Sequence, residues 1–484
     1  MDSELKQRRE QFVHGHLGGS FGEVVAVTSL LTLSHVLFSS FLFAYPILIN
    51  QKYSRIRSSL DFLLNIGPFL LAITIFESFI YHLLFLIILV IFLNFRRYIK
   101  RHKLKFSFPL EKSWTKISLE YEHFGSRLPY VSNLMSSLLL ATSIAIMAVD
   151  FPIFDRRFAK TEMYGWSLMD VGVGGFIAIN GALAAESRLI WDSKVTRFGL
   201  IWKAIKSGFP LLIIGLIRLC TVKELNYQEH VTEYGVHWNF FFTIAFTKLI
   251  SSILCCILPV SVNLFFVSIL ISAINQVILT YYGLTEYILH ADRSNLISAN
   301  KEGLISLTGS VCLYLFFVQI GRNYLPKRKV INDLLKIIRH VAVIAFISTT
   351  LMFSFHQYVE QTSRRETNFA FICFIIAFVS VLILIEISYF IFLHILSHQI
   401  REQPTTTKRP IIDPLDLDYQ SPIFESIGRR GLLMFLASNL MTGAVNFTVD
   451  TISITSSTIS LAILISYCAV LIIICQILQV TLNR

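Results

Sequence analysis

Stretches of about 20 apolar residues, each long enough to cross a bilayer, recur along this whole chain. Residues of the hydrophobic types make up 54% of its 484 residues and charged residues only 15%, which leaves little length for a soluble domain. The sequence predicts an all-α polytopic membrane protein, folded as a single domain over 1–484, with thirteen transmembrane helices. These predicted spans are 21–44, 58–77, 79–95, 129–149, 164–185, 207–222, 237–257, 259–281, 302–321, 338–356, 369–395, 430–448 and 457–482.

The distribution of Lys and Arg predicts the orientation of the spans. The odd-numbered loops and the C-terminal tail hold about 28 of these residues, and the N-terminus and the even-numbered loops about 11. Because basic loops stay in the cytoplasm, we expect a lumenal N-terminus and a cytoplasmic C-terminus. The net charge of +11 is spread over separate short loops, so no nucleic-acid partner is expected. The basic cytoplasmic loop 96–128 either anchors the chain at the membrane or attracts anionic lipid or a CoA phosphate.

Several classes of chemistry lack their signatures. All seven cysteines lie inside apolar stretches, which argues against a disulfide framework and against CxxC metal sites. The chain has no phosphate loop, no HExxH pair and no GxSxG elbow. The first span is too long for the core of a cleavable signal peptide, so we expect it to remain as an anchor.

Polar residues interrupt the apolar pattern at the segment AVDFPIFDRRFAK (148–160). Asp150 ends the fourth span, where a carboxylate becomes costly as it approaches the bilayer centre. Arg156, Arg157 and Lys160 follow closely and could pair with Asp150 or bind an anion. The alternative is a helix-ending carboxylate with cations that reach out to water. The fifth span then opens with Asp170 and the run GVGG, whose glycines allow a helix or a lipid chain to approach closely.

A second polar segment, ELNYQEHVTEYGVHWNFFF (224–242), carries Glu229, His230, His237 and Asn239. A histidine beside a carboxylate suits acid or base chemistry near neutral pH. His230 and His237 lie seven residues apart without a nearby third ligand, so no metal site is expected. The alternative is a hydrogen-bonded cluster at the membrane interface.

Two further polar segments follow even-numbered spans. Residues 286–303 include His290, Asp292 and Arg293, which could bind a polar head group or cap helices. Residues 437–451 include Asn446, which begins a formal glycosylation sequon, but its place at the membrane edge favours an intramolecular hydrogen bond. The predicted topology places all four polar segments on the lumenal side. Such a gathering is typical of a site for a polar head group attached to a lipid.

The same segments carry a family resemblance. The strings AVDFPIFDRRFAK, SLMDVGVGGF, YQEHVTEYGVHWNFF, LHADRSNLISANKEG and NLMTGAVNFT resemble the Gwt/PIG-W family of inositol acyltransferases in GPI-anchor biosynthesis, most densely over 142–310. The N-terminal string RREQFVHGHLGGSFGEVVAVTS resembles the fungal members more than the animal ones. The resemblance implies thirteen spans in the endoplasmic reticulum membrane. It also implies transfer of an acyl chain, usually palmitoyl, from acyl-CoA as co-substrate to the inositol of glucosaminyl-phosphatidylinositol, with no resident cofactor.

The resemblance also implies roles for individual residues. The Asp and Lys that the family uses in catalysis fall on Asp150 and Lys160, which we expect to act as general base and as stabilising cation. Asp155 receives no role. The remaining candidates fall into three groups. We expect the phosphate to contact Arg156 and Arg157, and the acyl groove to be lined by Asp170, Gly172, Gly174 and Gly175. We expect the head group, or a proton in transfer, to contact Glu229, His230, His237, Asn239, His290, Asp292, Arg293 and Asn446.

Without the resemblance, a lipid or small-solute transporter is the main alternative, because many proteins with numerous spans are transporters. A polar path through the midplane would support it, yet Arg218 and Glu386 are the main midplane charges in the spans concerned. An O-acyltransferase of another membrane-bound family is the enzymatic alternative, and its embedded His has no clear equivalent here. The sequence leaves the oligomeric state open.

Overall fold

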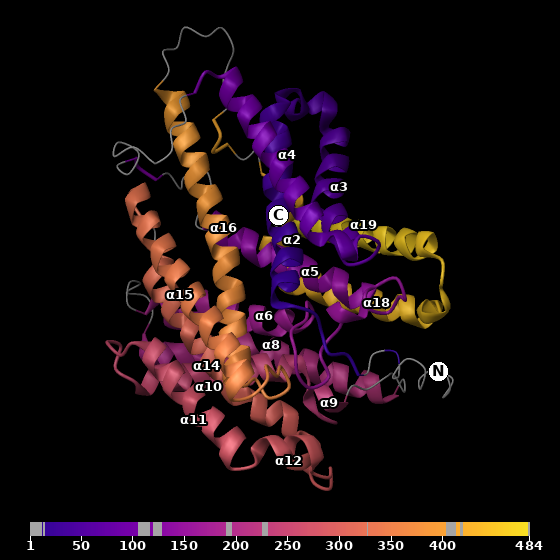
Figure 1. Ribbon diagram of the computed structural model, residues 1–484, viewed down its shortest axis with the longest axis vertical. Coiled ribbons are helices and arrows are strands. Elements are labelled where there is room, and N and C mark those ends of the chain that lie inside the picture. The colour runs from indigo at the N-terminus through magenta and orange to yellow at the C-terminus, as the bar shows by residue number, and fades with distance from the viewer. Residues whose placement is uncertain are drawn as a thin grey trace. The chain divides into compact units, whose positions relative to one another are not determined.

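The computed structural model describes residues 12, 15–104, 117–119, 128–189, 196–224, 231–326, 328–402, 413–416 and 420–482. Its helices gather into two compact units (Figure 1). The first unit comprises Met1–Ser20, Ala159–Pro326 and Ile344–Val379. The second comprises Phe21–Phe158, Lys327–Val343 and Ser380–Arg484. Each is described here by itself.

Eleven helices within the described residues are long and apolar enough to cross a membrane, and all coincide with predicted spans. This confirms an all-α polytopic membrane protein. The two remaining predicted spans, 58–77 and 164–185, also contain helices, but neither helix meets the criteria of length and hydropathy.

The helices in those two segments differ from full spans for separate reasons. Helix α3 (Ser54–Ala72) has a polar buried side, on which Asp61 accepts hydrogen bonds from the Ser421 hydroxyl at 2.6 Å and the Ile423 N–H at 3.1 Å. These bonds fix the start of α17 (Pro422–Arg429). Helix α6 (Asp170–Ala182) has only 13 residues, about 20 Å of helix against a hydrocarbon core of about 30 Å.

The first unit is built around α14 (Lys301–Tyr324), which is buried over most of its length. Helices α6, α10 and α11 pack against it, and α8 packs against α10. The unit also contains the end of α15 and the beginning of α16. Its other helices are α7 (Ala185–Arg188), α8 (Arg197–Glu224), α9 (Val231–Tyr234), α10 (Phe240–Ile257), α11 (Leu264–Tyr281), α12 (Leu284–His290) and α13 (Leu296–Ala299).

Glycines allow α6 and α14 to approach each other closely. A Cβ at Gly181 would lie 2.5 Å from the carbonyl oxygen of Tyr314, and a Cβ at Gly321 would lie 2.2 Å from that of Ala182. Any larger side chain would push the helices apart, so this packing requires glycine at both positions.

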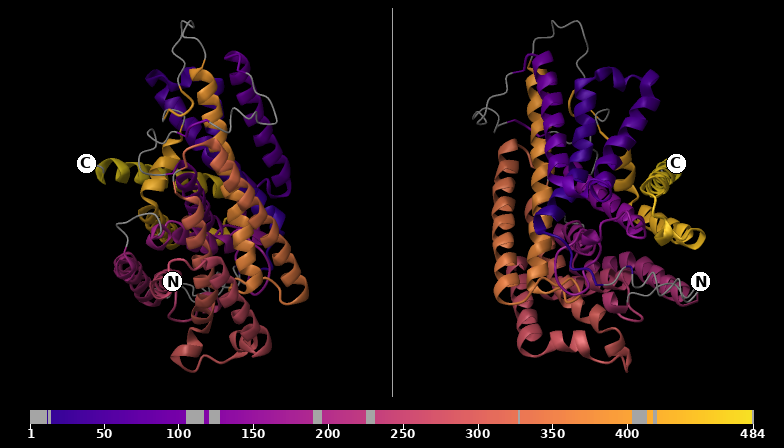
Figure 2. Two further views of the ribbon diagram at one scale, coloured as in Figure 1. Left: turned by 90° about the vertical axis from the view of Figure 1, so that its left-hand side faces the viewer. Right: turned by 45° about the vertical axis from the view of Figure 1, so that its right-hand side comes forward.

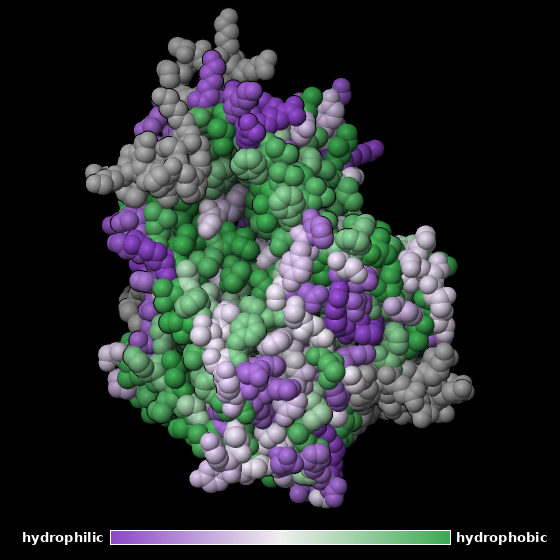
Figure 3. All heavy atoms as spheres, in the orientation of Figure 1, coloured by the Kyte–Doolittle hydropathy of each residue, from purple (hydrophilic) through white to green (hydrophobic). Residues whose placement is uncertain are grey.

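The second unit surrounds α2 (Phe21–Ala44), against which α3, α4 and α5 pack. Helix α4 exposes large apolar side chains, including Phe85, Phe92 and Leu93. Hydrophobic side chains cover much of the face that Figure 3 shows. Such a face suits contact with lipid. Helices α18 and α19 form a hairpin, yellow in both views of Figure 2. The bounds are α4 (Ile80–Arg101), α5 (Pro129–Ala148), α18 (Gly431–Thr448) and α19 (Ser457–Leu482).

Two long helices, α15 (Ile331–Tyr358) and α16 (Phe369–Arg401), each contribute one part to each unit. The loop that joins them (residues 359–368, the α15–α16 loop) lies in the first unit. Seven consecutive polar residues of this loop, from Thr362 to Asn368, are buried. Asn368 caps α16 by accepting the Phe371 N–H at 3.0 Å, and it also accepts the Ser363 N–H at 3.2 Å.

Candidate functional site

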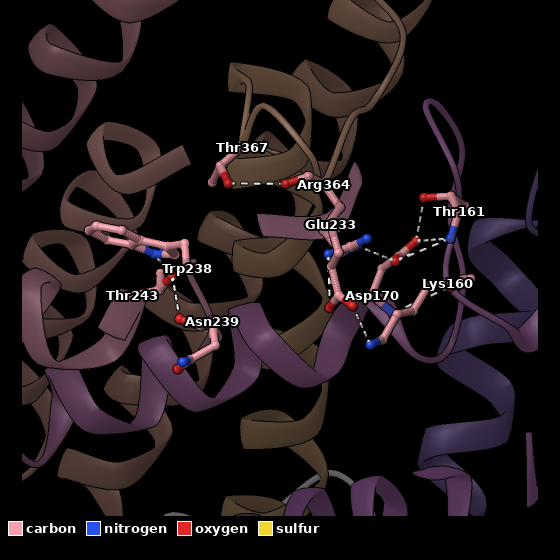
Figure 4. Close-up of polar contacts among 10 residues, drawn as sticks. Lys160, Thr161, Asp170, Glu233, Trp238, Asn239, Thr243, Arg364 and Thr367 are labelled. Atoms are coloured by element: carbon pink, nitrogen blue, oxygen red, sulfur yellow. Dashed lines mark hydrogen bonds and ion pairs between the residues drawn. The ribbon is translucent and has the colours of Figure 1, made fainter. Parts of the chain in front are cut away.

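Lys160 of the first unit ends the polar segment 148–160 and lies in the loop after η6 (Arg156–Phe158). Its Nζ donates a hydrogen bond of 2.8 Å to Oε2 of Glu233 on α9 (Figure 4). The Lys160 side chain keeps 38% of its surface exposed, whereas Glu233 keeps 12%. The ammonium is therefore held in place and remains accessible.

Asp170, the first residue of α6, holds the residue that follows Lys160. Its carboxylate accepts the Thr161 hydroxyl at 2.7 Å and the Thr161 backbone N–H at 3.3 Å (Figure 4). The Asp170 backbone N–H donates to the hydroxyl of Ser167 at 3.3 Å, which helps to start the helix. Asp170 is fully buried.

Arg364 of the α15–α16 loop joins the two carboxylates. Its Nε lies 2.8 Å from Oδ1 of Asp170, and its Nη1 donates to Oε1 of Glu233 at 3.4 Å (Figure 4). Burial acts to lower the pKa of Arg364, but Glu233 and Asp170 act to raise it, and the net shift is upward. The guanidinium therefore stays charged. We call Lys160, Asp170, Glu233 and Arg364 the ionic cluster.

A small cavity adjoins the ionic cluster within the first unit. Glu233, Tyr234 and Arg364 give it a charged and polar side, and Leu313 and Phe371 contribute apolar side chains. Hydroxyl groups also line it, from Thr243, Ser306, Ser310 and Thr367. Burial raises the pKa of Tyr234, as does the charge of Glu233, so its phenol stays protonated and can donate a hydrogen bond. The cavity has polar side chains on one side and apolar side chains on the other, and it has room for about one water molecule.

Asp150 belongs to the second unit and lies in the turn after α5. Asn446 of α18 donates from Nδ2 to Oδ2 of Asp150 at 2.7 Å, and its own Oδ1 accepts the Thr451 hydroxyl at 3.2 Å. The intramolecular hydrogen bond expected for Asn446 is confirmed. Asp150 is half-buried, so its carboxylate is oriented without being sealed from solvent.

Both arginines of the same segment are engaged within the second unit. Arg156 donates to the backbone carbonyls of Phe154 at 3.0 Å and of Val149 and Phe151 at 2.9 Å. Burial lowers its pKa to about 10, which leaves it charged at neutral pH. Arg157 pairs with Glu23 at 3.3 Å and with Asp155 at 3.1 Å. These contacts order the loop that carries Asp150 and leave few donors for the phosphate predicted as their ligand.

The second polar segment is described only from residue 231 onward, so the candidates Glu229 and His230 lie outside the described residues. The backbone N–H of His237 donates to Asn300 Oδ1 at 2.7 Å. Asn239 caps α10 by accepting the N–H groups of Phe241 at 3.0 Å and Phe242 at 3.3 Å. Within the described ranges, no group of three His, Cys, Asp or Glu side chains could hold a metal ion.

The third polar segment divides between the surface and the interior. His290 is exposed and lies 3.5 Å from Glu286, and Asp292 is also exposed. Arg293 donates two hydrogen bonds, of 3.0 and 2.6 Å, to the fully buried carboxylate of Glu302. Arg365 donates to the same carboxylate at 2.8 Å. Arg293 therefore belongs to a second buried ionic group within the first unit.

The glycines of α6 serve close packing in this structure. A Cβ at Gly174 would lie 2.4 Å from the side chain of Ile375 on α16, although Gly174 also lines the cavity. Gly175 is buried and Gly172 half-buried. Asp170, which was grouped with them as an acyl-groove residue, lies instead in the ionic cluster.

Glu233, Arg364 and Thr161 are the site residues that sequence reasoning missed. Arg364 lies 194 residues after Asp170 in the chain, in a segment with no resemblance motif. A signal was present in the polar run TSRRETN (362–368), which separates two strongly apolar stretches. Its burial could not be read from the sequence, because polar loops ordinarily lie at the surface.

The long apolar helices define an integral membrane protein, and its first unit holds a mostly buried ionic cluster beside a small cavity. The GWT1 family model matches residues 5–478. The chain belongs to the GWT1 family and is an acyltransferase. This membership removes the basis of the transporter alternative.

Curated relatives match over nearly their full length. The chain is 31% identical over 487 residues to GPI-anchored wall transfer protein 1 of Candida albicans, covering 93% of this chain and 92% of the relative. It is 34% identical over 469 residues to glucosaminyl-phosphatidylinositol-acyltransferase PIGW of Bos taurus, covering 92% of each. The Saccharomyces cerevisiae wall transfer protein is 33% identical over 480 residues, again covering 92% of each. Fungal and bovine relatives are thus about equally similar, so the expected bias toward the fungal branch is not visible.

Proposed function

We propose that this acyltransferase moves a fatty acyl chain, typically palmitoyl, from acyl-CoA to an inositol hydroxyl of glucosaminyl-phosphatidylinositol in the endoplasmic reticulum membrane. Family membership and the name of the bovine relative support the acceptor. The many apolar helices suit a lipid acceptor.

The assignment of roles to residues rests on the environment of Lys160. Its ammonium is partly exposed, yet it is fixed by a carboxylate that is itself bound by a buried arginine. A cation oriented before the reaction can stabilise the oxyanion of acyl transfer without reorganisation. Lys160 therefore serves as the stabilising cation in this proposal.

Asp150 serves as the general base. It takes the proton of the inositol hydroxyl as the hydroxyl oxygen attacks the thioester carbon. Collapse of the tetrahedral intermediate breaks the carbon–sulfur bond, and the proton passes to the leaving CoA thiolate. The transfer is direct in this proposal, because the seven cysteines all lie outside the motif loops.

The test uses microsomes supplied with labelled acyl-CoA and glucosaminyl-phosphatidylinositol. Asp150→Asn and Lys160→Ala should each lower kcat by about 100-fold or more. Matched controls are Asp333→Asn and Lys336→Ala, which alter a surface ion pair of 3.3 Å on α15 and should leave the rate near that of the wild type. Full activity of both site variants at normal protein levels would overturn the residue assignment.

A further inference from the structure

We infer that Arg364 is a positioning residue for the acyl transfer, which holds Lys160 in place through the two carboxylates of Glu233 and Asp170. The inference rests on the proposed role of Lys160 and adds a part of the chain outside the family motifs. It assigns Arg364 no contact with the substrate.

Lys160 is held at two points. Its ammonium is bound by Glu233 at 2.8 Å. Its backbone is fixed through the next residue, because Asp170 accepts both the N–H and the hydroxyl of Thr161. A flexible four-carbon side chain bound at one end alone would retain much of its rotamer freedom. Restraint at both ends defines where the ammonium lies.

Both restraints depend on one guanidinium. Arg364 pairs with Asp170 at 2.8 Å and with Glu233 at 3.4 Å, using different nitrogens for the two carboxylates. The side chain of Arg364 is 7% exposed and that of Asp170 1% exposed. The planar fork of arginine can join two carboxylates in a fixed geometry, which the point charge of a lysine cannot reproduce.

The charges of the cluster also depend on Arg364. Two buried carboxylates that lose their shared cation repel each other and gain protons more readily. A protonated Glu233 would bind the Lys160 ammonium less strongly. Lys160 and Arg364 pair with Glu233 from neighbouring elements, and Tyr234 follows it on α9, where the charge of Arg218 of α8 also acts on Tyr234.

The loop that carries Arg364 provides a matched control. The neighbouring Arg365 is equally buried, at 7% exposure, and binds a different carboxylate, that of Glu302. Replacing Arg364 takes the paired cation from the buried Asp170, and replacing Arg365 takes one of two cations from the buried Glu302, which Arg293 still binds, so both replacements should lower stability. Only the replacement of Arg364 disturbs Lys160.

The experiment measures kcat, KM and the pH profile of Arg364→Met, Arg364→Lys and Arg365→Met in the full-length protein, with each rate normalised to folded enzyme. Arg364→Met should lower kcat about 100-fold, the scale expected for a misplaced catalytic group, with little change in KM. It should also move the acidic limb of the kcat profile to higher pH, because Glu233 then takes up a proton more readily. Arg364→Lys should return the acidic limb of the profile to its wild-type pH but should not restore the full kcat. Arg365→Met should lower the stability of the protein and leave the acidic limb at its wild-type pH.

A second variant keeps the inference testable if Arg364→Met does not fold. Thr161→Val removes one hydrogen bond to Asp170, preserves the shape of the side chain and should lower kcat about tenfold, the equivalent of about 1.4 kcal/mol. Wild-type values of kcat in both Arg364→Lys and Thr161→Val, or an equal limb shift in Arg365→Met, would overturn the positioning role. If Lys160→Ala is fully active, the proposed function of Lys160 fails first. If Lys160→Ala is inactive and the arginine variants behave alike, only the present inference fails.

Discussion

Asn446 donates a hydrogen bond of 2.7 Å to Asp150, although 296 residues separate them in the chain. The bond occupies one carboxylate oxygen, Oδ2, and thereby orients the group proposed as the base. Because the amide is buried and the carboxylate half-buried, water cannot simply replace the donor. Asn446 therefore helps to orient Asp150, the proposed base.

Removal of this support should slow the reaction. Asn446→Ala should lower kcat about tenfold, the effect expected from the loss of a hydrogen bond to a charged group. The measurement is acyl transfer in microsomes at matched protein levels. Asn439→Ala is the control, since Asn439 lies two turns earlier on α18 and donates to the Phe435 carbonyl of its own helix. Equal rates for the two variants would contradict the assignment.

A buried contact between a histidine and a carboxylate in the second unit should contribute strongly to stability. His35 Nε2 lies 2.8 Å from Glu386 Oε1, with both side chains at most 5% exposed. His35→Leu leaves Glu386 without this partner and should cost about 3 to 5 kcal/mol. Thermal unfolding of the purified protein in detergent measures the loss.

Two further variants test the origin of that loss. His394 is also buried, but its ring nitrogen contacts the Phe390 carbonyl of its own helix at 2.9 Å, so His394→Leu should cost less. The double variant His35→Leu with Glu386→Gln removes the unpaired charge and should recover part of the stability. A double variant no more stable than His35→Leu would show that charge is not the cause.

The α15–α16 loop should make stability depend on pH. Burial, together with the neighbouring Glu360, raises the pKa of Glu366 from its usual 4.5 to about 8. A raised pKa stabilises the fold while the group holds its proton, so this contribution is complete below about 4.5 and is lost as pH rises through about 8. Melting temperature should fall across that window.

Glu366→Gln should remove this part of the pH dependence, because the amide stays neutral throughout. The same substitution at Glu425, which is exposed and paired with Arg429, should leave the slope unchanged. If the melting temperature of Glu366→Gln changed with pH as in the wild type, Glu366 would not be the source of this pH dependence.

The predicted orientation has a direct test. A glycosylation tag at the N-terminus should be modified in microsomes and a tag at the C-terminus should not, because the basic loops are expected in the cytoplasm. The internal sequon at Asn446 should stay unmodified, since its amide is buried and bonded to Asp150. The reverse pattern of tag modification would overturn the orientation.

The helices were largely predictable, because long apolar stretches have few alternatives in a membrane. The two shorter helices were not. In α3, Asp61 and Asn65 lie on a buried face that binds the start of α17. The predicted span 58–77 is therefore partly polar, because these side chains pack against another helix. In α6, the helix begins only at Asp170 and is too short for a full span.

The candidate site was predictable where its residues lie close together in the chain. Asp150 stood out because a carboxylate at the end of a span is costly, and the family resemblance pointed to Lys160. The partner of Asp170 could not be found in this way, since the Arg364 that binds it comes from a loop much later in the sequence. Pairing across such separations depends on helix packing, which one sequence does not reveal.

Arg364 and Arg365 are consecutive in the chain, yet they bind carboxylates of two different groups. Because both residues are arginines, their positions along the loop, and not their side-chain type, decide which carboxylate each one binds. Deleting one residue before Arg364 would tend to draw Arg365 toward the place of its neighbour and leave Glu302 short of a cation. The number of residues between α15 and α16 is thus as much a requirement of the site as the identity of any one of them.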